Sequence, residues 1–244
     1  MPTCIALIVA AGRGARFGGP VPKQYAVLGG KTVLRHTVDA LAACPSIGDV
    51  RVVIAAGDEA LYAAATNGLT LPAPVLGGVS RQHSVLNGLE ALANQAPDFV
   101  AIHDAARPFV DRAQVDACLS AAAQSGIDGA VLGIPLADTL KRVDATNAIT
   151  ETVPRTRLWR AQTPQVFRFA PLLAAHRRAA TLGNEETTAL TDDAAVAELA
   201  GLKVVMVPGS EEASGMRLSR PQGLKSTVKL EAKFPWLCDS SYHS

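Results

Sequence analysis

Short apolar segments alternate with amphipathic segments over the first 134 residues, and this alternation constrains the fold more than any other feature. Residues 4–9 are a continuous apolar run rich in β-branched side chains, which is typical of a strand buried on both faces of a parallel sheet. Further strands are expected at 50–56, 74–76, 99–102 and 129–134, and helices at 32–43, 58–66, 81–94 and 112–124. This order predicts a doubly wound, mostly parallel α/β sheet.

The pattern changes after residue 136. Segments 139–143 and 148–153 alternate polar and apolar residues around a turn-like segment, which predicts an antiparallel hairpin with one solvent-exposed face. Such a hairpin is marginally stable alone and needs a surface to pack on. Helices are expected again at 169–181 and 192–200, followed by a strand at 203–207.

Composition argues against several classes of protein. The 23 Lys and Arg and 22 Asp and Glu give a net charge of +1, so no basic surface for nucleic acid is expected. The longest uncharged run, 60–80, is interrupted by Pro72 and Pro74, which argues against a transmembrane helix. The sequence shows no signal peptide, and its four cysteines lack the spacing of a zinc or redox site. A cytoplasmic protein without a membrane or nucleic-acid partner is the expectation.

The glycine-rich segment after the first strand is the strongest indication of chemistry. Backbone N–H groups of such a turn can approach phosphates closely, and Arg16 and Lys23 can neutralise phosphate oxygens. Two familiar phosphate motifs do not fit. The dinucleotide fingerprint needs glycine where Phe17 stands, and the P-loop pattern needs glycine where Tyr25 stands. A solvated surface loop is the alternative.

Two further segments fall where ligands bind in such sheets. Gly77 and Gly78 precede a helix that Ser80 is expected to cap, which suits a phosphate or a base edge but also a simple turn. Asp104 follows the strand 99–102, where a carboxylate can hold Mg²⁺ or a substrate hydroxyl, or cap the next loop. His103 is either a hydrogen-bonded structural residue or a base.

Nothing in the sequence indicates covalent catalysis. There is no Gly-x-Ser-x-Gly elbow, no cysteine with an evident partner and no metal-binding His–Glu helix. Arg155, Arg157 and Arg160 form a cluster suited to phosphate recognition or to a solvated surface. The sequence favours phosphoryl or nucleotidyl transfer, because it combines two glycine turns, several cations and one carboxylate at the end of a strand.

These segments together resemble the family of 2-C-methyl-D-erythritol 4-phosphate cytidylyltransferases, enzymes of the non-mevalonate isoprenoid pathway. The resemblance covers about residues 3–221, and the matching segments, in family order, are 10–16, 22–25, 81–85, 103–108, 138–141, 158–159, 162–165 and 191–192. It implies a Rossmann-like nucleotidyltransferase domain over 1–224 that uses CTP, methylerythritol phosphate and Mg²⁺. The substrate phosphate would attack the α-phosphorus of CTP in line and release pyrophosphate.

The resemblance also implies roles for individual residues. The implied catalytic residues are Arg16 and Lys23; the nucleotide contacts are Ala10, Ala11, Gly12, Gly78 and Ser84; the substrate contacts are Asp104, Arg107, Thr139, Arg155 and Arg217, with Asp104 also near the metal. In the family, the hairpin over about 137–160 is an arm that clasps a second subunit and delivers Thr139 and Arg155 into the neighbour's site. A homodimer with shared sites is therefore expected.

The sequence departs from the family near its C-terminus. Arg217 stands where the family has a substrate-binding lysine, which keeps the charge but not its point-like geometry. Residues 225–244 fit the family poorly, which suggests either a lineage variation or an altered or truncated frame of a bifunctional protein. The functional alternatives are a cytidylyltransferase for another polyol phosphate, such as ribitol 5-phosphate, and a non-catalytic CTP-binding protein.

Overall fold

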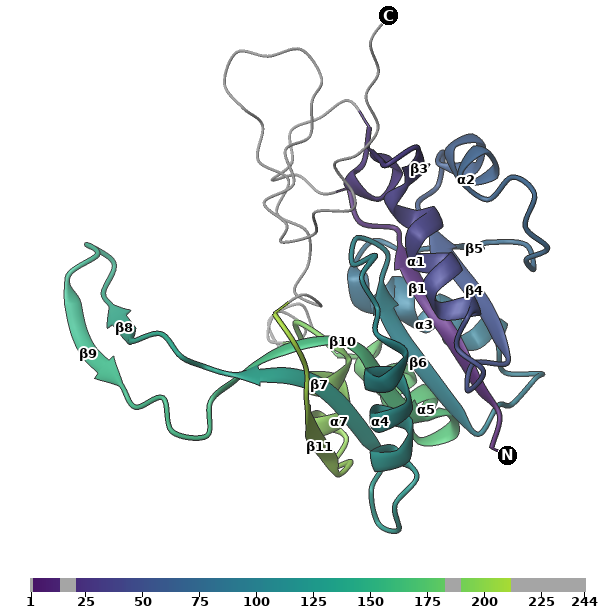
Figure 1. The fold of residues 1–244 in the computed structure, drawn as a ribbon. Helices are drawn as coiled ribbons and strands as arrows, with labels where there is room; N and C mark the ends of the chain where they lie inside the picture. Colours follow the sequence, from purple (N-terminus) through teal and green to yellow (C-terminus); the bar gives the residue numbers. More distant parts are fainter. Residues whose placement is uncertain (1, 14–20, 183–189, 212–244) are drawn as a thin grey trace, which may run out of the picture.

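A seven-stranded sheet forms the centre of the computed structural model, which describes residues 2–13, 21–182 and 190–211. The strands are β1 (Cys4–Ala10), β4 (Asp49–Ile54), β5 (Val75–Leu76), β6 (Phe99–Asp104), β7 (Gly129–Pro135), β10 (Trp159–Arg168) and β11 (Val204–Pro208). Their order across the sheet is β11-β7-β10-β6-β1-β4-β5 (Figure 1). All neighbouring pairs are parallel except those of β10, which runs antiparallel to β6 and β7. The expected mostly parallel α/β sheet is confirmed.

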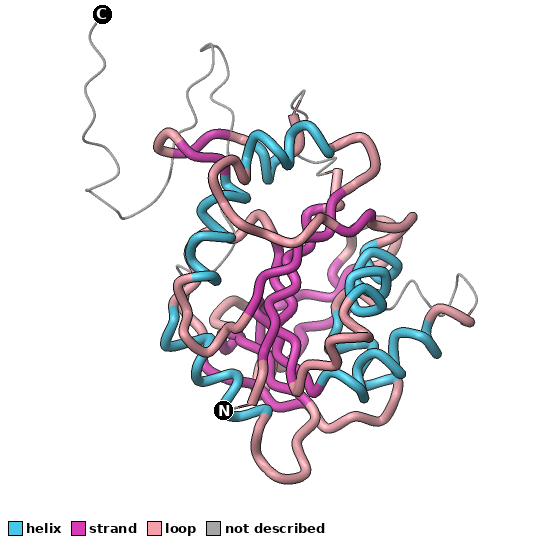
Figure 2. The backbone as a smooth tube through the Cα atoms, turned by 90° about the vertical axis from the view of Figure 1, so that its right-hand side faces the viewer, coloured by secondary structure: helices cyan, strands magenta, loops and turns pink. Residues whose placement is uncertain are grey.

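Helices cover both faces of this sheet (Figure 2). Side chains of α1 (Val33–Ala42), α2 (Glu59–Ala65) and α4 (Arg112–Ala122) pack into one core cluster, and those of α3 (Arg81–Ala91), α5 (Phe169–Ala179) and α7 (Asp193–Leu199) into a second. Along β1, Ala6 and Ile8 belong to the first cluster and Ile5 and Leu7 to the second. This alternation explains why β1 is apolar at every position. None of the helices in the described ranges is long and apolar enough to cross a membrane.

Polar side chains fix the starts of three helices where the sequence predicts them. The hydroxyl of Thr32 accepts from the backbone N–H of Arg35 at 3.1 Å, and that of Ser80 accepts from His83 at 3.1 Å. Asp192 caps α7 by accepting from the backbone N–H of Ala195 at 3.0 Å. Each cap satisfies a backbone donor that has no partner within its helix.

Strand β10 is absent from the sequence-based prediction, which left 159–168 without an element. Pro164 lies within it, and proline is uncommon inside strands because it cannot donate a hydrogen bond to a neighbour. The pairing with β7 shifts register between Ala161 and Gln165, and this irregularity accommodates the proline. Two short elements were also unpredicted: the 3-10 helix η2 (Lys23–Tyr25) and the hairpin of β2 (Val27–Leu28) with β3 (Lys31–Thr32).

The predicted hairpin is confirmed as a separate two-stranded sheet of β8 (Leu140–Val143) and β9 (Ile149–Val153). It extends away from the central sheet as a long arm (Figure 1). Cross-strand pairs hold it together: Arg142 Nε lies 2.8 Å from Glu151 Oε2, and Lys141 Nζ donates to Thr152 Oγ1 at 2.6 Å. Nearly every residue of both strands is exposed.

Candidate functional site

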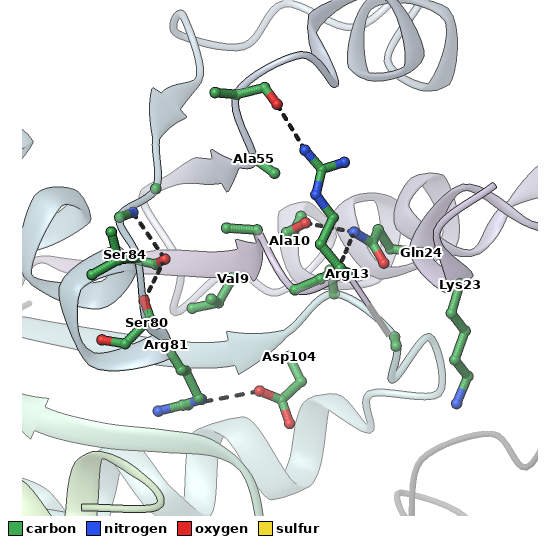
Figure 3. A pocket seen from close by; sticks show the side chains of 18 residues that line it. Val9, Ala10, Arg13, Lys23, Gln24, Ala55, Ser80, Arg81, Ser84 and Asp104 are labelled. Atoms are coloured by element: carbon green, nitrogen blue, oxygen red, sulfur yellow. Dashed lines mark hydrogen bonds and ion pairs between the residues drawn. The ribbon is translucent and has the colours of Figure 1, made fainter. Parts of the chain in front are cut away.

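A cleft of about 740 Å³ opens at the carboxyl ends of β1, β4, β5 and β6. The strand order reverses at β1, which has β4 on one side and β6 on the other, and ligands of open α/β sheets bind at such a point. Seven of the residues to which the resemblance gives a role line this cleft: Ala10, Ala11, Gly12, Lys23, Gly78, Ser84 and Asp104 (Figure 3).

The turn after β1 is anchored from two sides. The buried amide of Gln24 donates through Nε2 to the carbonyls of Ala10 at 2.6 Å and Gly12 at 3.0 Å. On the other side, Arg13 Nη1 pairs with Asp58 Oδ1 at 2.9 Å and Nη2 donates to the carbonyl of Ala56 at 2.8 Å. These contacts fix the backbone of residues 10–13 before a ligand arrives, which suits phosphate recognition because these residues need not be ordered on binding.

The turn between β5 and α3 forms a second wall of the cleft, next to the turn after β1. Ser84 Oγ accepts from the backbone N–H of Gly78 at 3.1 Å and donates to the carbonyl of Ser80 at 2.8 Å. A Cβ on Gly77 would lie 2.6 Å from the Cβ of Ala11, so only glycine lets this turn approach the turn after β1. The buried hydroxyl of Ser84 therefore holds the shape of the wall.

Lys23 and Asp104 bring opposite charges to the cleft. Lys23 is half-buried on η2, and burial, followed by the nearby charge of Arg107, lowers the pKa of its ammonium. Asp104 ends β6 and is flanked by two guanidinium groups. Its Oδ2 lies 3.1 Å from Arg107 Nε. Its Oδ1 lies 3.7 Å from Arg81 Nη2, and this pair is drawn in Figure 3. The contact with Asp104 holds the Arg107 side chain beside the cleft.

His103 precedes Asp104 but faces the interior. Its ring is fully buried, and Nε2 forms a hydrogen bond with the carbonyl of Arg107 at 2.9 Å. Burial lowers the pKa of His103 to about 4, so the ring is neutral at physiological pH. These contacts favour a structural role, in which His103 fixes the loop that carries Arg107.

Asp104 is the carboxylate of the described chain that lines the cleft, and its donor chemistry fits a magnesium ion that arrives with a nucleotide. Mg²⁺ takes hard oxygen ligands and is commonly bound through one or two carboxylates together with substrate phosphates and water. No group of three or more His, Cys, Asp or Glu side chains within the described residues could hold a metal without such help.

The other predicted site residues lie elsewhere. Thr139 and Arg155 are exposed on the arm and do not line the cleft of their own chain, and the Arg155 guanidinium donates to the carbonyl of Ala137. Arg16 and Arg217 lie outside the described residues. The structure therefore gathers the predicted nucleotide contacts but separates the two arm residues from them.

Three residues that position the site received no role from the sequence. Arg81 lines the cleft; Asp193, at the start of α7, accepts from Arg81 Nη2 at 2.7 Å; and Thr163 Oγ1 accepts from the backbone N–H of Asp104 at 3.3 Å. The adjacent acids Asp192 and Asp193 were a signal, but they stand at the start of the helix expected at 192–200, where acidic residues are common. The structure assigns the cap to Asp192 and turns Asp193 inward.

Comparison with known proteins gives a consistent result. The sequence model of the 2-C-methyl-D-erythritol 4-phosphate cytidylyltransferase family matches residues 4–228. The chain is 52% identical over 213 residues to the "Bifunctional enzyme IspD/IspF" of Rhodospirillum rubrum, which covers 87% of this chain and 53% of that protein. This chain therefore spans about half the length of the curated relatives it matches.

Solved structures agree with this match. A crystal structure of 4-diphosphocytidyl-2C-methyl-D-erythritol synthase superposes with a TM-score of 0.73 at 30% identity, covering 91% of this chain and 94% of that one. The corresponding synthase of Anaerococcus prevotii gives a TM-score of 0.73 at 25% identity, with 87% and 91% coverage. The cleft, its glycine turns and the family match over residues 4–228 lead to one assignment: this chain belongs to the 2-C-methyl-D-erythritol 4-phosphate cytidylyltransferase family.

Proposed function

We propose that this chain transfers the cytidylyl group of CTP to 2-C-methyl-D-erythritol 4-phosphate in isoprenoid precursor biosynthesis. A phosphate oxygen of the acceptor attacks the α-phosphorus of CTP, the bond from that phosphorus to the bridging oxygen breaks, and pyrophosphate leaves. The products are 4-diphosphocytidyl-2-C-methyl-D-erythritol and pyrophosphate. Family membership supports this acceptor over ribitol 5-phosphate and supports catalysis over CTP binding alone.

The observation that carries the proposal is that the anchored turn after β1, Lys23 and Asp104 all line one cleft. In-line phosphoryl chemistry needs little beyond positioning and charge stabilisation, and this cleft offers both. The acceptor phosphate has a second pKa near ~6 and is mostly dianionic at neutral pH, so no strong protein base is required. The neutral, buried His103 is consistent with that expectation.

Each part of the cleft has a place in this reaction. The backbone of Ala10, Ala11 and Gly12 cradles the triphosphate, and Lys23 offsets the charge that builds up on the α-phosphate oxygens. Gly78 and Ser84 shape the wall on which the cytosine rests. Arg107, beside Asp104, is suited to the acceptor phosphate. Arg16 and Arg217, outside the described residues, are assigned to the triphosphate and the acceptor by resemblance.

We propose Mg²⁺ as the cofactor, held by Asp104 together with the nucleotide. When bound, the ion supplies Lewis-acid stabilisation of phosphate charge. The Asp104 carboxylate would then share its oxygens between the ion and the two flanking arginines. The positions of Arg81 and Arg107 therefore affect the affinity of Asp104 for a cation.

We also propose a homodimer formed through the arm. Five large apolar side chains are exposed along it and at its base: Leu140, Val143, Ile149, Leu158 and Trp159. An exposed apolar row on a two-stranded ribbon favours a partner surface, and a second copy of the chain would bring Thr139 and Arg155 to a cleft that lacks them.

Three described cysteines, Cys4, Cys44 and Cys118, are free thiols, which supports the reducing cytoplasm as the location.

The test is pyrophosphate release from CTP and Mg²⁺, with methylerythritol phosphate and ribitol 5-phosphate offered in parallel. We expect release with methylerythritol phosphate alone. Release only with ribitol 5-phosphate would keep the mechanism and change the acceptor. Absence of release with either, from a folded protein that binds CTP, would overturn the catalytic proposal in favour of a binding protein.

A further inference from the structure

A fully buried carboxylate lies directly behind the cleft. Asp193, the first residue of α7, has no exposed side-chain surface, and its Oδ2 accepts from Arg81 Nη2 at 2.7 Å. Its Oδ1 lies 3.3 Å from Nε2 of His176 on α5, whose ring is also fully buried. Burying a carboxylate is costly unless it is paired, so Asp193 is bound to Arg81 as its counter-ion.

Arg81 joins this buried pair to the site. Its side chain is 32% exposed and lines the cleft, and the same Nη2 that binds Asp193 lies 3.7 Å from Asp104 Oδ1 (Figure 3). That second distance is too long for a hydrogen bond. Burial alone would lower the pKa of Arg81, but the carboxylates of Asp193, Asp104 and Asp192 outweigh it and raise the pKa. Two carboxylates therefore compete for one guanidinium, and Asp193 holds it more closely.

We propose that Asp193 is a positioning residue that holds the Arg81 guanidinium back from Asp104. Retained by Asp193, Arg81 steadies the Asp104 carboxylate by its charge but leaves Oδ1 available for a ligand in the cleft. Without Asp193, the Arg81 guanidinium moves onto Asp104, because Asp104 is then the carboxylate that lies beside it. This inference rests on the proposed function, in which Asp104 meets Mg²⁺ and nucleotide, and it gives α7 a part in setting the affinity of the site.

The test is the Mg²⁺ concentration that gives half-maximal CTP binding, measured by titration calorimetry without acceptor. We expect Asp193→Asn, which keeps the shape but removes the charge, to raise this concentration by about tenfold or more. The double variant Arg81→Met/Asp193→Asn removes the competing guanidinium and should return it toward the wild-type value. A double variant as impaired as Asp193→Asn would show that the effect does not pass through Arg81.

Asp192→Asn is the matched control. It removes a charge from the neighbouring position and keeps the helix cap, because asparagine caps helices as well as aspartate does. It should bind CTP as the wild type does. If Asp193 is only structural, Asp193→Asn will lower the melting temperature without changing the Mg²⁺ requirement, and the proposal fails.

If Asp193→Asn does not fold, Arg81→Lys is a second variant in which the Mg²⁺ requirement can be measured. It leaves Asp193 with a cationic partner but replaces the planar fork by a point charge, so the Mg²⁺ requirement should change in a folded protein. An unchanged requirement in that variant overturns the inference. Because the readout is binding, a wild type that binds CTP but transfers nothing would defeat the proposed function and leave this test intact.

Discussion

At the scale of single residues, the ammonium of Lys23 is a described cation placed to stabilise charge in the transition state, since it lines the same cleft as the turn after β1 and Asp104. We predict that Lys23→Ala lowers kcat by about 10²–10³-fold, the usual loss when one preorganised electrostatic donor is removed. Its melting temperature should remain close to that of the wild type, because Lys23 is only half-buried. Steady-state kinetics with thermal unfolding checks both. Near-normal turnover would remove Lys23 from the mechanism.

The pH dependence of kcat gives a second test of Lys23, with Lys23→Arg as the matched variant. Burial and the charge of Arg107 lower the pKa of Lys23, so its charge is lost at a lower pH than that of an exposed lysine. Wild-type kcat should therefore decline on the alkaline side below the ordinary lysine pKa of about 10.4. In Lys23→Arg, whose guanidinium stays charged, that decline should move to higher pH even if the maximum falls.

His103 leads to a prediction about stability in acid. Its folded pKa is about 4, below the ordinary value of about 6.5, so between these values the unfolded chain binds a proton that the folded chain does not. Stability is therefore lost as pH falls from about 6.5 to 4, by roughly 3 kcal/mol in total. Urea unfolding should show this loss in the wild type and a smaller one in His103→Gln. Equal slopes in the two proteins would contradict it.

At the scale of elements, the cleft depends on the contact between the turn after β1 and the turn before α3. We predict that Gly77→Ala disturbs this contact, because its new Cβ would meet the Cβ of Ala11 at 2.6 Å and Ser84 Oγ at 2.8 Å. The expected cost is about 1–3 kcal/mol in unfolding free energy, with weaker CTP binding. Gly48→Ala is the control, since its Cβ would lie 3.7 Å from the carbonyl oxygen of Cys4, an ordinary contact. If CTP binds Gly77→Ala as tightly as the wild type, the turns are not coupled.

The elements also show what sequence patterns can and cannot predict. Hydrophobic spacing and caps were sufficient for β1, α1 and α3, because their partners bury whole faces and their ends are set locally. Strand β10 escaped prediction because Pro164 lies within it and several of its buried residues are polar, although Val166 and Phe167 are apolar. Buried Gln162, Thr163 and Gln165 bond to segments far along the chain, and no local signal specifies those partners. The same reason hid the inward turn of Asp193.

At the scale of the whole molecule, the winding of the sheet explains why the sequence could bring the residues of the cleft together but could not place those of the arm. Residues that follow β1, β5 and β6 meet at one edge because parallel strands end there together, so their order in the sequence is enough to place them. Thr139 and Arg155 end on an arm that extends from the body (Figure 1). In the proposed homodimer their place in a site depends on a second molecule, and only the resemblance pointed to it.

The arm leads to a prediction about shared sites that a mixing experiment can decide. If each cleft takes Lys23 from one subunit and Arg155 from the other, then Lys23→Ala and Arg155→Ala homodimers are both impaired for different reasons. A mixed dimer has one cleft with both defects and one with neither, so unfolding and refolding the two variants together should restore about a quarter of wild-type sites. Because the exposed apolar side chains of the arm should be covered on assembly, the mass in solution should be that of a dimer. Recovery no greater than the sum of the separate variants, or a fully active monomer, would mean that each cleft is completed by its own chain, and the arm would then need to fold back onto the body that carries it.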